Sequence, residues 1–358
     1  MTIVLFVSGL LFLIAGAESL VRGASRLAAA VGISPLVVGL TVVAFGTSAP
    51  ELAVSVKSAL ADQAGIAVGN VVGSNIFNVL FILGVSALIV PLVVSSQLIR
   101  MDVPIMVALS VLVLVLALDG GFSRFDGIVL FVGLLVYISV LIIMSRKESA
   151  TVKQEFAEEY GTAADTSVSW LKDTLLIIVG LALLVTGSRW FVDSAVTFAQ
   201  YLGVSELVVG LTIVAAGTSM PEVVTSIIAA LRGERDIAVG NVVGSNIFNL
   251  MGVLGVASII APTGITVSPE FVRFDIPVMI LVALACVPIF FTGGVISRQE
   301  GLVLLAYYAA YTAYLIMVAT ASDALAWFGP MMLFVAIPLT FITMLALAVR
   351  EARRHKSR

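Results

Sequence analysis

The chain contains eleven apolar stretches that are each long enough to cross a bilayer as a helix, a length of about 20 residues. They lie at roughly 2–22, 34–59, 65–90, 102–118, 126–145, 172–192, 205–231, 237–260, 274–292, 299–319 and 326–349. Only 11% of the 358 residues are charged and 60% are hydrophobic, whereas soluble domains carry about 25% charged residues. Because lipid offers the backbone no hydrogen-bond partner, the spans should be helices. The sequence therefore predicts an all-α polytopic membrane protein and excludes a soluble enzyme, a secreted disulfide scaffold and a disordered chain.

The positions of lysine and arginine predict how these helices are oriented. With the amino terminus outside, fifteen of the 19 basic residues fall in inner segments and three in outer segments, while Arg189 lies within a span. Segments rich in Lys and Arg stay in the cytoplasm. We therefore expect a multi-pass protein of the cell (cytoplasmic or plasma) membrane, with its amino terminus outside and its basic carboxyl terminus inside.

Two segments of the first half recur in the second half at a constant separation of 171 residues. GLTVVAFGTSAPE at 39–51 matches GLTIVAAGTSMPE at 210–222 at ten of 13 positions, and AVGNVVGSNIFN occurs unchanged at 67–78 and 238–249. Each copy comprises five predicted spans, and an odd number of crossings gives the second copy the opposite topology. This arrangement is the inverted repeat of many secondary transporters, whose substrate sites lie near the membrane midplane.

The duplication divides the chain into four parts with a ten-helix core. We expect a first inverted repeat at 1–145, a cytoplasmic linker at 146–171, a second inverted repeat at 172–320, and an extra C-terminal transmembrane helix with the basic tail at 321–358. The linker is too short to fold as a domain of its own.

Both repeats place polar side chains inside apolar spans. Glu51 follows Thr47 by four residues and Ser48 by three, so the three side chains share one helix face. Pro50 has no N–H and disrupts the helix there, which loosens nearby carbonyls. The second repeat has the same spacing in Thr218, Ser219, Pro221 and Glu222. In the next span of each repeat, the i, i+4 pairs are Ser74 with Asn78 and Ser245 with Asn249.

These side chains form an all-oxygen set of two carboxylates, two amides and several hydroxyls. Such a set suits hard cations, and Ca²⁺ takes six to eight oxygen ligands. Two unpaired glutamates in lipid would cost about 2.5–3.5 kcal/mol each, a cost that a bound cation or proton offsets. A site that should not stand empty and ionised favours exchange over one-way transport. One cysteine, Cys286, and one histidine, His355, leave no ligand set for haem, zinc or an iron–sulfur cluster, so no cofactor is expected.

At these residues the chain resembles the sodium/calcium exchanger branch of the calcium/cation antiporter superfamily. The paired GTSxPE and GNVVGSNIFN segments resemble the two α-repeats of that family, and the resemblance covers about residues 1–320. It implies a secondary active antiporter that exchanges Na⁺ for Ca²⁺ by alternating access and generates a current. By motif position it implies Glu51 and Glu222 as the central Ca²⁺ ligands. The implied further ligands of the Ca²⁺ and Na⁺ sites are Thr47, Ser48, Ser74, Thr218, Ser219, Ser245 and the carbonyls of Ala44 and Ala215, with Asn78 and Asn249 near the middle of the cluster.

Two other functions fit parts of this pattern. A Ca²⁺/H⁺ antiporter on the same fold would use the two glutamates as proton carriers, although GTSxPE resembles the sodium branch. A passive cation channel would use the same oxygens but leave the inverted duplication unexplained. An enzyme is not expected, because the spans contain no histidine and no paired-aspartate motif. Neither a nucleic acid nor a required protein partner is indicated.

Two smaller features complete the expectations. Many potassium-dependent relatives carry aspartate where this chain has Asn249, and the neutral amide predicts exchange that does not need K⁺. Glu18 with Arg22, and Arg189 with Asp193, are i, i+4 pairs towards the ends of spans. We expect them to be local ion pairs without a role in transport.

Overall fold

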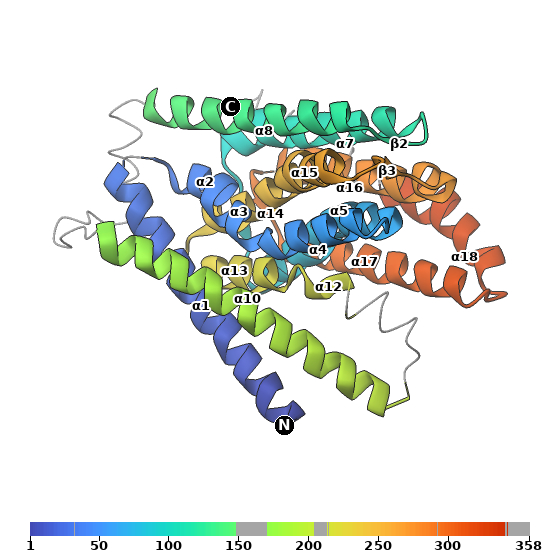
Figure 1. Ribbon diagram of the computed structural model, residues 1–358, viewed down its shortest axis with the longest axis horizontal. Helices are drawn as coiled ribbons and strands as arrows, with labels where there is room; N and C mark the ends of the chain where they lie inside the picture. The colour runs from blue at the N-terminus through green and yellow to red at the C-terminus, as the bar shows by residue number, and fades with distance from the viewer. Residues whose placement is uncertain are drawn as a thin grey trace.

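The computed structural model describes residues 1–31, 33–147, 170–203, 213, 215–291, 293–340 and 342, and these form a helical bundle (Figure 1). Eight helical stretches within them are long and apolar enough to cross a membrane: Thr2–Ala28, Ala64–Ile89, Leu98–Ala117, Arg124–Ser145, Trp170–Tyr201, Arg235–Ile260, Phe271–Phe291 and Arg298–Ala319. A ninth candidate is a bent pair, Pro35–Thr47 and Ala49–Leu60, whose halves meet at 46°. The prediction of an integral, multi-pass membrane protein is thus confirmed.

The remaining two predicted spans, at 205–231 and 326–349, are described only in part. The first includes α12 (Ala215–Gly217) and α13 (Met220–Leu231), and the second begins with α18 (Leu325–Met331) and η7 (Met332–Ala336). Residues 204–212, 214 and those after 342 lie outside the described part, as does most of the predicted linker at 146–171. The count of eleven spans, the orientation and the domain boundaries stay predictions.

In the described residues, the elements of the second repeat follow the same order as their counterparts in the first, where η marks a π-helical turn. The first repeat contains α1 (Thr2–Val31), α2 (Pro35–Val38), η1 (Gly39–Val43), α3 (Ala44–Thr47), α4 (Ala49–Leu60), α5 (Ala64–Phe77), η2 (Asn78–Leu83), α6 (Gly84–Ile89), β1 (Leu92–Val93), η3 (Leu98–Asp102), α7 (Val103–Ala117), β2 (Gly121–Phe122) and α8 (Arg124–Lys147). The second contains α10 (Trp170–Tyr201), α12, α13, α14 (Arg235–Phe248), η5 (Asn249–Val253), α15 (Leu254–Ile260), β3 (Ile265–Thr266), η6 (Phe271–Asp275), α16 (Ile276–Phe291), β4 (Val295–Ile296) and α17 (Arg298–Ala319).

Two short strand pairs show that the second repeat is inverted. β1 precedes α7 and β2 follows it, so the two strands lie at opposite ends of one span. β1 pairs antiparallel with β4, and β2 with β3. By position in the repeat, however, β1 corresponds to β3 and β2 to β4. Equivalent loops therefore lie at opposite ends of the bundle, as an inverted duplication requires.

The most buried spans are the equivalent stretches α5–η2–α6 and α14–η5–α15. In the apolar 18-residue stretch of each span, 72% of the residues are buried in the first and 83% in the second, against at most 39% in the other six continuous spans. In Figure 1, α4, α5, α13 and α14 lie in the middle of the bundle. The duplicated polar segments are therefore the centre of the molecule.

Helices α1 and α10 pack on each other through a seam of glycines and cross obliquely in Figure 1. Gly9, Gly16 and Gly23 recur every seven residues on α1, and they face Gly187, Gly180 and Asp173 of the antiparallel α10. A Cβ atom added at Gly180 would lie 2.8 Å from the carbonyl oxygen of Gly16. Such contact between backbones is possible only between small residues.

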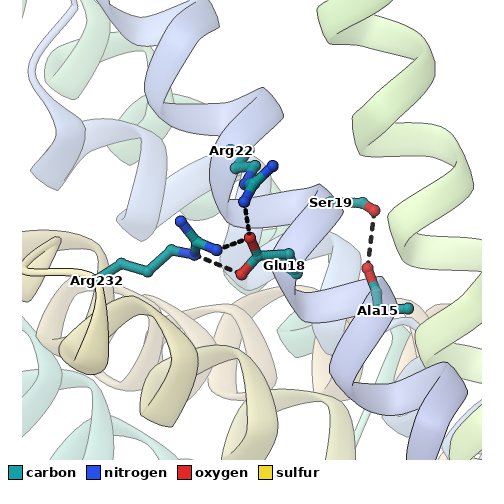
Figure 2. A network of polar contacts seen from close by, with 5 residues as sticks. All are labelled: Ala15, Glu18, Ser19, Arg22 and Arg232. Atoms are coloured by element: carbon teal, nitrogen blue, oxygen red, sulfur yellow. Dashed lines mark hydrogen bonds and ion pairs between the residues drawn. The ribbon is translucent and has the colours of Figure 1, made fainter.

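Glu18 connects the first helix to the second repeat. It accepts from Arg22 one turn later on α1, at 2.5 Å, which is the predicted local ion pair. It also pairs with Arg232, the residue that caps the C-terminus of α13 (Figure 2). The second contact joins α1 to the helix that carries Glu222, and sequence spacing could not have indicated it.

Candidate ion-binding site

Each of the two glutamates lies in the first turn of a half-helix. Ser48 separates α3 from α4 with backbone angles of φ −80° and ψ 9°, and Ser219 precedes α13 with φ −86° and ψ 10°. Pro50 and Pro221 occupy the second helical residues, where the missing N–H costs no helical hydrogen bond. The free N–H groups and the positive end of the helix dipole favour a carboxylate in this turn.

The two carboxylates accept hydrogen bonds from the opposite repeat. The Ser48 hydroxyl donates to Oε1 of Glu222 at 2.9 Å, and the Ser219 hydroxyl donates to Oε1 of Glu51 at 2.8 Å. All four side chains are at most 1% exposed. The sequence placed Ser48 and Glu51 on one helix face, and the structure adds that each glutamate is paired with the serine of the other repeat.

Several buried oxygens of the predicted ligand residues have no hydrogen-bond partner. Among the residues that the structure describes, the buried atoms without a partner include Oε2 of Glu51, Oε2 of Glu222, Oδ1 of Asn78, Oδ1 of Asn249 and Oγ of Ser245. An unpaired buried polar atom costs about 1–3 kcal/mol, and more if it is charged. These oxygens come from both repeats, and a cation between them would offset that cost.

The threonines are tied to asparagines that the sequence prediction did not include. The Thr47 hydroxyl donates to Oδ1 of Asn241 at 3.1 Å, and the Thr218 hydroxyl donates to Oδ1 of Asn70 at 3.3 Å. The Asn70 amide in turn donates to the backbone carbonyl of Glu51 at 3.0 Å. These asparagines therefore link the two half-helix breaks across the repeats.

The second repeat contains the equivalent hydrogen bond from an asparagine to the backbone of its glutamate. The Asn241 amide donates to the backbone carbonyl of Glu222 at 3.5 Å and to the hydroxyl of Ser226 at 3.0 Å. The sequence did contain a signal that could have identified these two asparagines. They lie in the unchanged GNVVGSNIFN segment, where Asn70 and Asn241 precede Ser74 and Ser245 by one helical turn.

The other predicted ligands differ in whether their oxygens already have hydrogen-bond partners. The carbonyl of Ala44 accepts from Ser48 N at 3.0 Å and lies 3.4 Å from the Thr47 hydroxyl oxygen. The Ser74 hydroxyl oxygen lies 3.2 Å from that of Ser219, within hydrogen-bond distance, whereas its counterpart Ser245 carries the unpartnered oxygen described above. Ala215 lies in the backbone of α12, one turn before Ser219.

The charge of the cluster defines what it could bind. In the described part of the chain, no three His, Cys, Asp or Glu side chains form a metal-binding group. A cation here would therefore meet two carboxylates, with a total formal charge of −2, and otherwise neutral oxygens. This composition suits a hard divalent cation or several monovalent ones.

A family comparison agrees with this geometry. The model of the sodium/calcium exchanger protein family matches residues 1–143 and 172–317, which is most of both repeats. The chain belongs to this family. As a member of it, the chain is a cation antiporter, and the matched residues end before α18.

Individual relatives and a solved structure are similar over most of the chain. The putative antiporter CaxA of Alkalimonas amylolytica is 39% identical over 85% of this chain and 95% of its own length. The sodium/calcium exchanger MaX1 of Methanosarcina acetivorans is 34% identical over the same shares. The exchanger NCX_Mj, in a structure soaked with 2.5 mM Na⁺ and 1 mM Sr²⁺, superimposes with a TM-score of 0.72 and 30% identity over 90% of this chain and 98% of that one. The fold prediction, a ten-helix core of inverted repeats, is confirmed.

Proposed function

We propose that this protein exchanges Na⁺ for Ca²⁺ across the cytoplasmic membrane by alternating access at the site between the two repeats. The observation that carries the proposal is the set of buried, unpartnered oxygens on Glu51, Glu222, Asn78 and Asn249, as found among the described residues. Two carboxylates balance one Ca²⁺, so the loaded site is neutral and can move through a low-dielectric interior. Similarity to proteins named as exchangers supports the choice of ions.

The assignment of ligands follows the two repeats. Glu51 and Glu222 bind Ca²⁺ directly, and the hydroxyl and carbonyl oxygens form sites that several Na⁺ occupy when Ca²⁺ has left. The proposed set of ligands is Ala44, Thr47, Ser48, Glu51, Ser74, Asn78, Ala215, Thr218, Ser219, Glu222, Ser245 and Asn249. If more than two of these Na⁺ are exchanged for each Ca²⁺, as we propose, each cycle moves net charge across the membrane and the exchange is electrogenic.

Uptake of ⁴⁵Ca²⁺ into proteoliposomes under imposed ion gradients tests this function. We expect an outward Na⁺ gradient to drive Ca²⁺ uptake, and an inside-negative or inside-positive potential set with valinomycin to change its rate. A pH gradient without Na⁺ should drive no uptake. Full activity with the pH gradient alone would identify a Ca²⁺/H⁺ antiporter, and uptake that needs no countergradient would identify a channel.

Exchange should not need K⁺. With Ca²⁺ between two glutamates the site is neutral, and Asn249 adds no charge. We expect Na⁺-driven Ca²⁺ flux to be unchanged when choline replaces K⁺. Asn249→Asp adds a third carboxylate, whose charge is costly in the membrane, so this variant should become K⁺-dependent or lose flux. Loss of wild-type flux in choline would contradict the charge argument.

The proposed orientation predicts which side of the membrane each connection faces. In a Cys286→Ala background, Tyr160→Cys should react with an impermeant maleimide only from the cytoplasm, and Ser322→Cys only from outside. Lys and Arg placement is the reason. Labelling of both positions from one side would contradict the eleven-span topology.

A further inference from the structure

Two further asparagines, Asn75 and Asn246, lie at the centre of the bundle beside the proposed ligands. The Asn75 amide nitrogen donates to the backbone carbonyl of Asn246 at 3.2 Å, and the Asn246 amide nitrogen donates to the backbone carbonyl of Asn75 at 3.3 Å. Both side chains are 2% exposed. A backbone carbonyl can only accept a hydrogen bond, so these contacts define which end of each amide is nitrogen and which is oxygen.

The orientation of Asn75 and Asn246 in turn defines that of the ligand amides. Oδ1 of Asn75 accepts from Nδ2 of Asn249 at 3.1 Å, and Oδ1 of Asn246 accepts from Nδ2 of Asn78 at 3.0 Å. Since an amide oxygen cannot donate, Asn249 and Asn78 must turn their nitrogens towards these partners. Their own oxygens then point elsewhere, and within the described structure both are buried and unpartnered.

We propose that Asn75 and Asn246 are positioning residues that make Asn78 and Asn249 offer oxygen, and not N–H, to the transported cation. The inference rests on the proposed function. The connection crosses the repeats, because Asn75 on α5 orients Asn249 on η5, and Asn246 on α14 orients Asn78 on η2. A reversed amide would place the positive end of its dipole against the cation and weaken binding.

Two buried methionines complete the surroundings of the positioning residues. The Asn246 amide is 3.5 Å from the sulfur of Met106, and the Asn75 amide is 3.8 Å from the sulfur of Met279. A thioether sulfur accepts hydrogen bonds only weakly and never donates. It can therefore contact the N–H end of the asparagine amide but cannot bond to its oxygen, so the amide keeps the same orientation. Each positioning asparagine makes the same three contacts, to a backbone carbonyl, a ligand amide and a methionine sulfur, so both ligand amides have the same support.

A double-mutant cycle on Ca²⁺ binding to the purified full-length protein tests the crossed connection. If Asn75 acts through Asn249, Asn75→Ala should raise the Kd for Ca²⁺ about tenfold, and the double variant with Asn249→Ala should bind no more weakly than Asn249→Ala alone. Asn75→Ala should be additive with Asn78→Ala, its neighbour on the same helix. The mirrored cycles use Asn246→Ala, which should couple to Asn78→Ala and be additive with Asn249→Ala.

A conservative variant separates positioning from simple helix packing. Asn75→Asp keeps an oxygen that can accept from Asn249 but loses the N–H that bonds Asn246. If the amide acts by orienting Asn249, Asn75→Asp should bind Ca²⁺ at least about threefold more tightly than Asn75→Ala. This advantage should disappear in the Asn249→Ala background, where only the added charge of the aspartate remains. If it only joins α5 to α14, the aspartate should be as harmful as the alanine.

Different experimental results would overturn the positioning role and the proposed function on which it rests. Thermal unfolding and size-exclusion profiles identify any variant that fails to fold, and the mirrored Asn246 series then decides. Additive effects in the crossed cycles, or equal effects of Asn75→Asp and Asn75→Ala, overturn the positioning role while wild-type binding and exchange persist. A wild-type protein that binds no Ca²⁺ would instead overturn the proposed function, and the inference with it.

Discussion

Glu222→Gln is expected to reduce Na⁺-driven Ca²⁺ uptake by at least about 100-fold, or about 2.7 kcal/mol, while the protein still folds and inserts. The variant keeps an oxygen that can accept from Ser48, as Oε1 of Glu222 does at 2.9 Å. It loses one of the two negative charges that balance Ca²⁺. Glu51→Gln should behave in the same way, since Ser219 donates to Glu51 at 2.8 Å across the repeats.

Thermal unfolding of the same variants separates loss of the ion from loss of the fold. A ligand that binds only the folded state stabilises it, so Ca²⁺ should raise the unfolding temperature of the wild type but not that of Glu222→Gln. Without Ca²⁺, the variant should be at least as stable as the wild type, because an unpaired buried carboxylate has been removed. Glu270→Gln is the matched control on the exposed surface and should change neither quantity. Normal Ca²⁺ affinity in either buried variant would contradict the site.

Gly180→Leu is expected to destabilise the fold strongly. An added Cβ atom would lie 2.7 Å from the backbone nitrogen of Leu20 and 2.8 Å from the carbonyl oxygen of Gly16. Backbone atoms cannot move aside as a flexible side chain can, so α1 and α10 would have to separate. Overpacking of this kind costs about 1–3 kcal/mol or more, and we expect a lower unfolding temperature in detergent and a smaller yield of monodisperse protein.

The matched control for this seam is a substitution of similar size on the same helix. Ala182 lies two residues away on the exposed face of α10, so Ala182→Leu should leave the unfolding temperature nearly unchanged. Gly16→Leu should reproduce the effect of Gly180→Leu from the other side of the contact. Wild-type stability in both glycine variants would show that the two helices do not pack through this seam.

The membrane class and the inverted repeat follow from the sequence because both depend on patterns of length and composition. A run of about 20 apolar residues must be a helix in lipid, and an odd number of spans per repeat reverses the second copy whatever the helices contact. The half-helix breaks were also predictable, since Pro50 and Pro221 act within their own turn. The β1–β4 and β2–β3 pairs agree with that topology.

The contacts across the repeats were decided only by the tertiary structure. Spacing of three or four residues shows which side chains share a helix face, but it says nothing about which faces meet when the residues are 168–174 apart, as for Ser219 with Glu51 and Ser48 with Glu222. The positioning pair Asn75 and Asn246 was missed for this reason: each points away from its own repeat's ligands and towards the opposite helix. The sequence by itself determined which oxygens are available in the middle of the membrane. Which of them meet, and which end of each amide faces the cation, depends on how α5 and α14 pack against each other. The direction of each hydrogen bond is fixed by both of its partners, and here the two partners come from different repeats.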